Sequence, residues 1–206
     1  MIYDISPPIS RATKVWPGEP SIRQEILSDI QNGDNVMVSI LHSTVHVGAH
    51  ADAPCHFIKN ACSIGEVDLD PYIGRCQVIQ IQCQASEVIN PDRLVASIHA
   101  ERVLIKTQSF YGNGHWVENF AALSPEFVDH MKQKGIKLIG IDTPSVDPFH
   151  SKTLDAHKRF YANKMSILEG LDLTNISEGI YELIALPLKI IGFDASPVRA
   201  VLREIL

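Results

Sequence analysis

Three histidines and one aspartate fall within eleven residues of the chain, in the segment His46-Val47-Gly48-Ala49-His50-Ala51-Asp52-Ala53-Pro54-Cys55-His56. Neutral imidazole and carboxylate groups are the ligands that suit zinc and other first-row divalent metals. An H-x-x-x-H spacing is a weak signal by itself, and the D-x-x-x-H spacing that follows strengthens it. The segment therefore predicts a metal site, with a cluster of solvated loop histidines as the alternative.

The spacing of these residues requires a bend in the backbone. On a flat strand the Cα atoms of His46 and His50 would lie about 13 Å apart, which is barely short enough for one shared ion. A regular helix would align the two histidines but would turn Asp52 away, and Gly48 and Pro54 are poor residues for a helix interior. We therefore expect a strand that turns locally at Gly48-Ala49.

The elements that must position this segment are mixed strands and helices. Val36–His42 is apolar on both faces, which predicts a buried strand. Pro187 within the apolar run Tyr181–Ile190 suggests a strand at an edge or with a bulge. Further strands are expected at Ile2–Ile5, Gln77–Gln82, Arg102–Thr107 and Ile136–Asp142. The combination with helices indicates an α/β or α+β fold and leaves the strand order open.

Helix signals are fewer and sharper. Ser124-Pro125-Glu126 predicts a helix that starts with a capping serine and a proline, and that ends at Gly135. Asn90-Pro91-Asp92 predicts a shorter helix, and Thr153–Tyr161 predicts another. Ser196-Pro197 predicts a terminal helix whose apolar residues share one face: Val198, Val201, Leu202 and Ile205.

Composition narrows the class of protein. The 206 residues carry a formal net charge of −6, which argues against a nucleic-acid surface. The four cysteines form no C-x-x-C pair, so we expect free thiols in a reducing compartment. Residues 1–20 form a Pro-rich N-terminal arm without the pattern of a signal peptide, and no apolar stretch could span a bilayer. We expect a single domain over residues 1–206 and a cytoplasmic protein that binds neither membranes nor nucleic acid.

The metal segment also resembles a family signature. The pattern H-x-G-A-H-x-D-A-P-x-H-F over residues 46–57 is similar to that of the cyclase-like metal-dependent hydrolases. Six further segments, in the same order along nearly the whole chain, resemble the bacterial kynurenine formamidases (arylformamidases) of that group. They are Tyr3-Asp4-Ile5-Ser6-Pro7-Pro8, Val15-Trp16-Pro17-Gly18, Ile141-Asp142-Thr143-Pro144-Ser145-Val146-Asp147, Leu154-Asp155-Ala156-His157, Ile167-Leu168-Glu169-Gly170-Leu171 and Asp194-Ala195-Ser196-Pro197-Val198-Arg199.

This resemblance implies an α/β, single-domain cyclase-like fold with a mixed β-sheet core of the swivelling β/β/α type and flanking helices. It implies the hydrolysis of N-formyl-L-kynurenine, an aromatic formamide, to L-kynurenine and formate in tryptophan degradation. It also implies a homodimer.

The same resemblance implies a centre of two Zn²⁺ ions per subunit. His46, His50 and Asp52 would hold one ion, and Asp52 would bridge to a second ion. His157 and Glu169 would complete the second site.

Two further residues receive roles from the resemblance. His56 would donate and accept the proton, a task that suits a group titrating near neutrality. Trp16 would contact the substrate, and its indole could stack on an aromatic ring; as the alternative, it would anchor the Pro-rich arm. Asp142 and Asp147 could support the site from a strand end, although such residues more often cap turns.

Two other functions remain open. A related cyclase-family hydrolase acting on isatin or a cyclic imide would share the first metal set. A non-catalytic metal-binding protein would also contain metal, but would leave His56 and Trp16 without a purpose.

Overall fold

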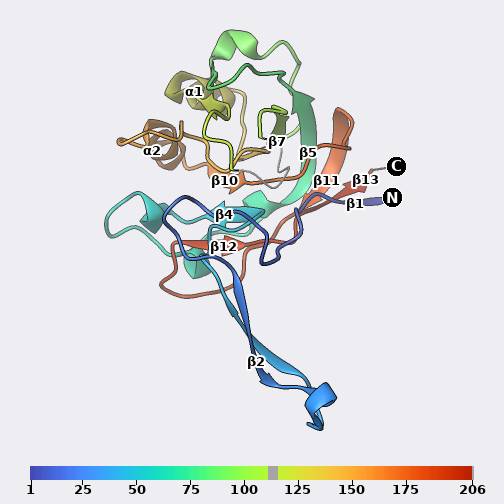
Figure 1. Ribbon diagram of the computed structural model, residues 1–206. Coiled ribbons are helices and arrows are strands. Elements are labelled where there is room, and N and C mark those ends of the chain that lie inside the picture. Colours follow the sequence, from blue (N-terminus) through green and yellow to red (C-terminus); the bar gives the residue numbers. More distant parts are fainter. Residues whose placement is uncertain (111–115, 206) are drawn as a thin grey trace.

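A nine-stranded mixed sheet forms the centre of the molecule, in a computed structural model that describes residues 1–110 and 116–205 (Figure 1). Its strands, in spatial order, are β1 (Ile2–Asp4), β13 (Val201–Glu204), β11 (Gly179–Ile184), β5 (Ile73–Gln80), β7 (Arg102–Lys106), β9 (Leu138–Ile141), β10 (Ser166–Glu169), β4 (His50–Asp52) and β12 (Ala195–Pro197). The central strands β5, β7, β9 and β10 are parallel, and their neighbours on both sides are antiparallel. The expected α/β fold with a mixed sheet is therefore confirmed.

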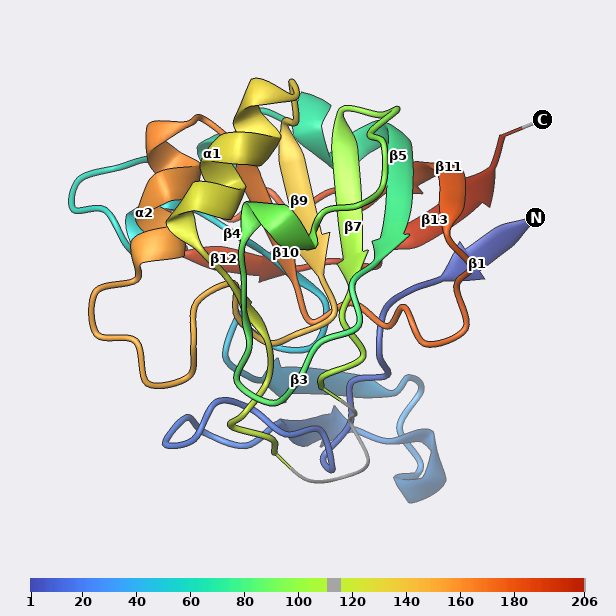
Figure 2. The ribbon, with the colours of Figure 1, turned by 90° about the horizontal axis from the view of Figure 1, so that it is seen from above.

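Two helices cover one face of the parallel strands (Figure 2). Helix α1 (Pro125–Gln133) starts as predicted, because the Ser124 hydroxyl accepts the backbone N–H of Phe127 at 3.0 Å. Helix α2 (Asp155–Ala162) falls in the predicted range. Neither helix of the described residues is long and apolar enough to cross a membrane. Single 3-10 turns lie at Ile30–Asn32, Pro54–His56, Ile64–Glu66, Asp70–Tyr72 and Pro91–Arg93, the last at the predicted short helix.

Alternating side chains divide the core into two apolar clusters. Val103 and Ile105 of β7 point toward the helices, where they join Phe127 and Phe160. Leu104, between them in the sequence, joins the cluster on the opposite face. There the covering segments are loops and the N-terminal arm. The metal segment therefore lies on the face of the sheet that loops cover. Loops can vary in sequence and conformation more readily than the strands beneath them.

The prediction of a buried strand at Val36–His42 is wrong. Strand β3 (Val38–His42) pairs with β2 (Arg23–Ser28) in a two-stranded hairpin that projects from the body (Figure 1). Its apolar residues are exposed, with Leu41 at 63% and Ile26 at 48%. Apolar residues on both faces are typical of a strand at the centre of a sheet. In this hairpin, both faces are exposed instead. A second small sheet joins β6 (Val88–Ile89) and β8 (Ala122–Leu123).

Two predictions for the C-terminal third are also wrong. Ser196-Pro197 does not begin a helix, because β12 pairs with β4 and β13 pairs with β11 and β1. Pro197 lies on the edge strand of the sheet, where its missing N–H is tolerated. The apolar run Tyr181–Ile190 is strand only to Ile184, and β11 lies inside the sheet because it ends before Pro187.

Candidate metal centre

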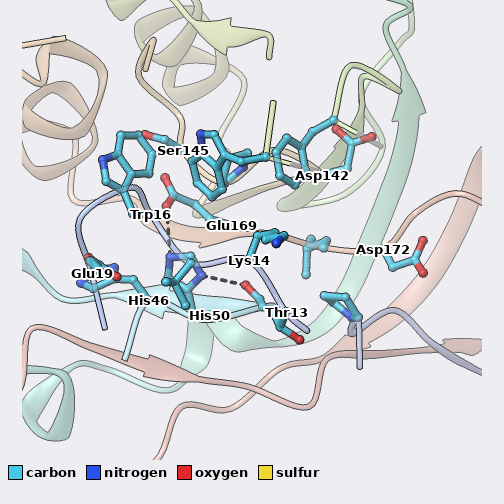
Figure 3. A pocket seen from close by; sticks show the side chains of 18 of the residues that line it. Thr13, Lys14, Trp16, Glu19, His46, His50, Asp142, Ser145, Glu169 and Asp172 are labelled. Atoms are coloured by element: carbon cyan, nitrogen blue, oxygen red, sulfur yellow. Dashed lines mark hydrogen bonds and ion pairs between the residues drawn. The ribbon is translucent and has the colours of Figure 1, made fainter. Parts of the chain in front are cut away.

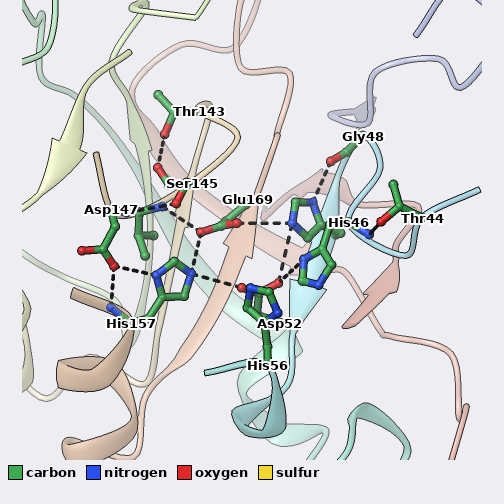
Figure 4. Close-up of polar contacts among 12 residues, drawn as sticks. Thr44, His46, Gly48, Asp52, His56, Thr143, Ser145, Asp147, His157 and Glu169 are labelled. Atoms are coloured by element: carbon green, nitrogen blue, oxygen red, sulfur yellow. Dashed lines mark hydrogen bonds and ion pairs between the residues drawn. The ribbon is translucent and has the colours of Figure 1, made fainter. Parts of the chain in front are cut away.

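The bend at Gly48 brings the first three predicted ligands together (Figure 4). Gly48 has a φ of +60°, a left-handed conformation that glycine adopts without strain. The chain then enters the short buried strand β4, which carries His50 and Asp52 on the side facing His46. The Nδ1 atom of His46 lies 3.1 Å from Oδ1 of Asp52. The predicted local turn therefore exists, and it solves the spacing problem.

Neighbouring elements supply the other two predicted ligands. Glu169 ends β10 and pairs directly with His50 across the sheet, so that His50 Nε2 lies 3.2 Å from Glu169 Oε2. His157 lies in the first turn of α2, and its Nε2 is 3.2 Å from Asp52 Oδ2 and 3.4 Å from Glu169 Oε1. All five predicted ligands thus converge, although they come from segments more than a hundred residues apart.

The potential ligand atoms form two overlapping groups. His50, Asp52 and Glu169 each offer an atom within 4.8 Å of the others, and so do His46, Asp52 and His56. Asp52 belongs to both groups, as a bridging carboxylate would. His56 lies close enough to be a ligand as well, so its expected role in proton transfer stays a prediction.

The buried polar atoms of the cluster fit a divalent cation. His50 Nδ1 lies 2.9 Å from the Gly48 carbonyl oxygen, which can only accept, so that nitrogen carries the proton. The lone pair on His50 Nε2 then faces carboxylate oxygens. Among the described residues, His50 Nε2 is buried without a hydrogen-bond partner, and the neighbouring Asp52 Oδ1 is contacted by the rings of His46 and His50. Such atoms are costly to bury unless a metal satisfies them, so the donor set fits divalent ions of the zinc type.

The pKa values of the ionisable groups in the cluster also favour a bound cation. Burial opposes a positive charge on His46, but the hydrogen bond to Asp52 and nearby carboxylates raise its pKa to about 9. Burial likewise opposes a charge on His157, and hydrogen bonds to Asp147 and Asp52 raise its pKa well above its ordinary value. The pKa of Asp52 is held well below its usual range despite burial, because His157 and His46 donate to it. The cluster therefore attracts positive charge, which metal ions can supply in place of protons.

Two carboxylates that received no ligand role orient the histidines. Asp147 Oδ2 lies 2.6 Å from His157 Nδ1, and the Asp147 carboxylate also accepts the N–H groups of Ala156 and His157 at 3.0 Å. Asp194 Oδ2 lies 3.0 Å from His46 Nε2 and 3.4 Å from His56 Nδ1. A carboxylate on the second ring nitrogen fixes the tautomer and raises the basicity of a metal-binding histidine.

The sequence gives different amounts of information about these two aspartates. Asp147 was expected to support the site or to cap a turn, and it does both at the start of α2. Asp194 lies in a segment of the family resemblance without an assigned role. Its distance of 148 residues from His46 leaves no local pattern that could have identified the contact.

A pocket of about 760 Å³ opens beside the five clustered residues (Figure 3). Aromatic side chains line one side of it, and the predicted substrate residue Trp16 lies among them. The Trp16 ring centroid is 5.3 Å from that of Trp116 and 4.9 Å from that of Phe149. Trp16 therefore anchors the arm and also presents a ring surface to the pocket.

Comparisons with known proteins agree with this arrangement. The model of the Cyclase family ("Putative cyclase") matches residues 3–148. A protein described as a "Potential Metal-Dependent Hydrolase With Cyclase Activity" is 27% identical, with a TM-score of 0.83 over 100% of this chain and 99% of that one. A protein from Bacillus stearothermophilus described as a "predicted metal-dependent hydrolase" is 26% identical, with a TM-score of 0.81 over 98% and 97% of the two chains. Isatin hydrolase A from Labrenzia aggregata, bound to benzyl benzoate, shares the fold at 20% identity and a TM-score of 0.80, over 98% and 93%.

Proposed function

The chain belongs to the Cyclase family, whose solved relatives include metal-dependent hydrolases, and from this premise we propose that it hydrolyses N-formyl-L-kynurenine to L-kynurenine and formate. The observation that carries the proposal is the position of the buried His and carboxylate cluster beside a pocket with an aromatic wall. The first feature suits metal-assisted hydrolysis, and the second suits an aryl substrate.

We assign two zinc ions to the centre. His46, His50 and Asp52 would hold one ion, while His157 and Glu169 would hold the other together with Asp52. Bound divalent ions of this type lower the pKa of water toward ~7 and polarise a carbonyl group. The fit rests on the unpartnered His50 Nε2 atom and on the charge balance of the cluster.

His56 is the proposed proton carrier. The reaction adds water to the formyl carbon and breaks the bond from that carbon to nitrogen, and the departing nitrogen needs a proton because it would otherwise leave as a strongly basic anion. Asp194 lies 3.4 Å from His56 Nδ1 and would keep a proton on that atom, which leaves Nε2 to exchange the other proton with the reacting groups. Proton transfer of this kind is typically worth about 10² to 10⁴ in rate.

Trp16 and its aromatic neighbours are the proposed ring-binding wall. The Trp116 ring meets Trp16 edge to face, at an interplanar angle of 74°. The aryl ring of the substrate would pack against this surface. Aromatic pairs in these geometries contribute about 0.5–1.5 kcal/mol beyond simple burial.

We also propose that the protein is a homodimer held by the β2–β3 hairpin. An isolated two-stranded hairpin is marginally stable in water, and this one exposes apolar side chains on both faces. A second copy of the chain would cover them, as the family resemblance implies.

Steady-state assays with N-formyl-L-kynurenine and with isatin test the proposed function. We expect turnover of the formamide, with a kcat/KM at least about 100-fold higher than for isatin. The reverse preference would assign the chain to the isatin-type hydrolases. Zinc binding without turnover of either compound would favour a non-catalytic metal-binding protein.

A further inference from the structure

The pocket beside the metal centre contains a positive charge that the hydrolysis itself does not use. Lys14 is the only lysine or arginine among the described residues that line the pocket. Lys14 takes part in none of the ion pairs among the described residues, which all involve other cationic groups. A free ammonium group in a substrate pocket is a recognition element for an anionic group.

A negative charge lies on the loop that follows Glu169, at Asp172. Asp172 also lines the pocket, and no cationic side chain of the described residues pairs with it. One of its oxygens, Oδ1, accepts the N–H of Thr174 at 3.1 Å, which leaves Oδ2 free for a ligand.

The loop that carries Asp172 is fixed from two sides. The backbone N–H of Asp172 donates to the Ile5 carbonyl oxygen at 2.8 Å. The buried ammonium of Lys106 donates to the carbonyl oxygens of Thr174 and Ile176, each at 2.9 Å. These bonds hold the carboxylate at a defined position, so little entropy is lost when it binds a ligand.

Lys14 follows a closed turn of the Pro-rich arm. The Thr13 hydroxyl donates to the Pro8 carbonyl oxygen at 3.1 Å and accepts the N–H of Ser10 at 2.8 Å. The backbone that precedes Lys14 is therefore ordered, while the exposed lysine side chain can adjust its reach. A lysine carries a compact charge on a flexible side chain, whereas arginine carries a rigid planar guanidinium group. Lys14 can therefore adjust to the position of its ligand.

Trp16 and Asp172 lie at different ends of the pocket. In Figure 3, Trp16 and Glu19 appear on one side of His50 and Glu169, and Asp172 appears on the other, with Lys14 in between. A substrate whose aryl group lies against Trp16 and that extends past the metal centre would bring its other end near Lys14 and Asp172.

We propose that Lys14 and Asp172 bind the zwitterionic amino-acid tail of the substrate, Lys14 the α-carboxylate and Asp172 the α-ammonium group. The inference rests on the proposed function, because it assigns the part of N-formyl-L-kynurenine that the metals and Trp16 leave unbound. A zwitterion that enters a pocket loses hydration, and partners of opposite charge offset that loss. The clamp therefore selects amino-acid formamides over simple aryl formamides.

The test compares two substrates in four variants of the zinc-loaded full chain. The substrates are N-formyl-L-kynurenine and 2′-formamidoacetophenone, which keeps the ring, ketone and formamide but lacks the amino-acid tail. For Lys14→Met and Asp172→Asn we expect kcat/KM to fall about 10- to 100-fold with the first substrate, mainly through KM, and to stay unchanged with the second. Lys152→Met, an exposed lysine outside the pocket, should change neither.

A binding measurement supports the kinetic comparison. Titration calorimetry with L-kynurenine should give a Kd about tenfold weaker for each pocket variant than for the wild type. Equal losses with both substrates, or no loss with either, would overturn the clamp. A selective loss in Glu19→Gln but not in Asp172→Asn would overturn the assignment of Asp172, since Glu19 also has a buried unpartnered oxygen, Oε2. Wild-type protein that hydrolyses isatin but neither formamide would instead overturn the proposed function.

Discussion

A Cβ atom at position 170 would lie 2.2 Å from the carbonyl oxygen of Gly48. That same oxygen lies 2.9 Å from Nδ1 of His50 and fixes the protonation of its ring. Gly170 also has a φ of +65°, directly after the proposed ligand Glu169. The two backbone segments beside the metal centre can therefore approach each other this closely only because glycines occupy positions 48 and 170.

Replacement of Gly170 by alanine should disrupt the centre. The methyl group must push the Gly48 carbonyl away, and His50 then loses the acceptor that orients it. We expect Gly170→Ala to bind zinc at least about tenfold more weakly, because lost orientation of a metal-binding histidine costs about 10- to 100-fold in affinity. Competition with a chromogenic chelator measures this affinity.

Gly135→Ala is the matched control for this prediction. Gly135 also has a positive φ, +82°, but no atom lies within 4 Å of a Cβ built there. We expect a loss of about 1 kcal/mol of stability from the backbone strain and an unchanged zinc affinity. Equal zinc affinity in the two variants would show that the contact between Gly170 and Gly48 has no part in building the site.

His50 and His56 should respond differently to replacement. His50→Ala removes a proposed ligand, and we expect metal and activity to be lost together. His56→Ala should keep its zinc and lose about 10² to 10⁴ in kcat, because only the proton carrier is removed. Metal analysis beside turnover of N-formyl-L-kynurenine checks both. Normal turnover of His56→Ala would refute its role, and loss of its zinc would make His56 a ligand.

Asp147→Asn tests the carboxylate behind His157. The substitution keeps the shape of the side chain but removes the negative charge 2.6 Å from His157 Nδ1. We expect zinc affinity to fall about 10- to 100-fold, with the fold intact by circular dichroism. Asp155→Asn, an exposed acid at the start of the same helix, should leave zinc affinity unchanged. The role assigned to Asp147 fails when both variants bind zinc like the wild type.

The hairpin gives a prediction about assembly. Leu41 is exposed at 63% on β3, and Leu41→Lys would place a charge on the proposed dimer surface. We expect this variant to sediment as a monomer and the wild type to sediment as a dimer. Val95→Lys, at an exposed apolar side chain outside the hairpin, controls for the added charge and should leave the dimer intact. A monomeric wild-type protein would contradict the proposal.

Local chemistry made part of this architecture predictable from the sequence. The bend at Gly48 follows from the reach of two histidines and from the properties of glycine. The start of α1 follows from the Ser124 cap, which needs only neighbouring residues. The grouping of His157 and Glu169 with the first ligands depended on the family resemblance, since neither residue has a local pattern that indicates a ligand.

Features that depend on distant chain segments could not be predicted in this way. The apolar pattern of Val38–His42 is that of a buried strand, and a single sequence does not reveal that the segment forms an exposed hairpin with β2. Val201 and Leu202 fit the spacing of a helix face, yet pairing with β11 and β1 makes their segment a strand. The contact of Asp194 with His46 likewise exists only after the edge strand is in place.

The most direct test of the central claim is zinc content and N-formyl-L-kynurenine hydrolysis, measured before chelation, after chelation and after zinc is returned. We predict about two zinc ions per subunit, loss of turnover on their removal, and recovery when zinc is restored. Unchanged turnover in metal-free protein, or fully zinc-loaded protein that does not hydrolyse the formamide, would contradict the account.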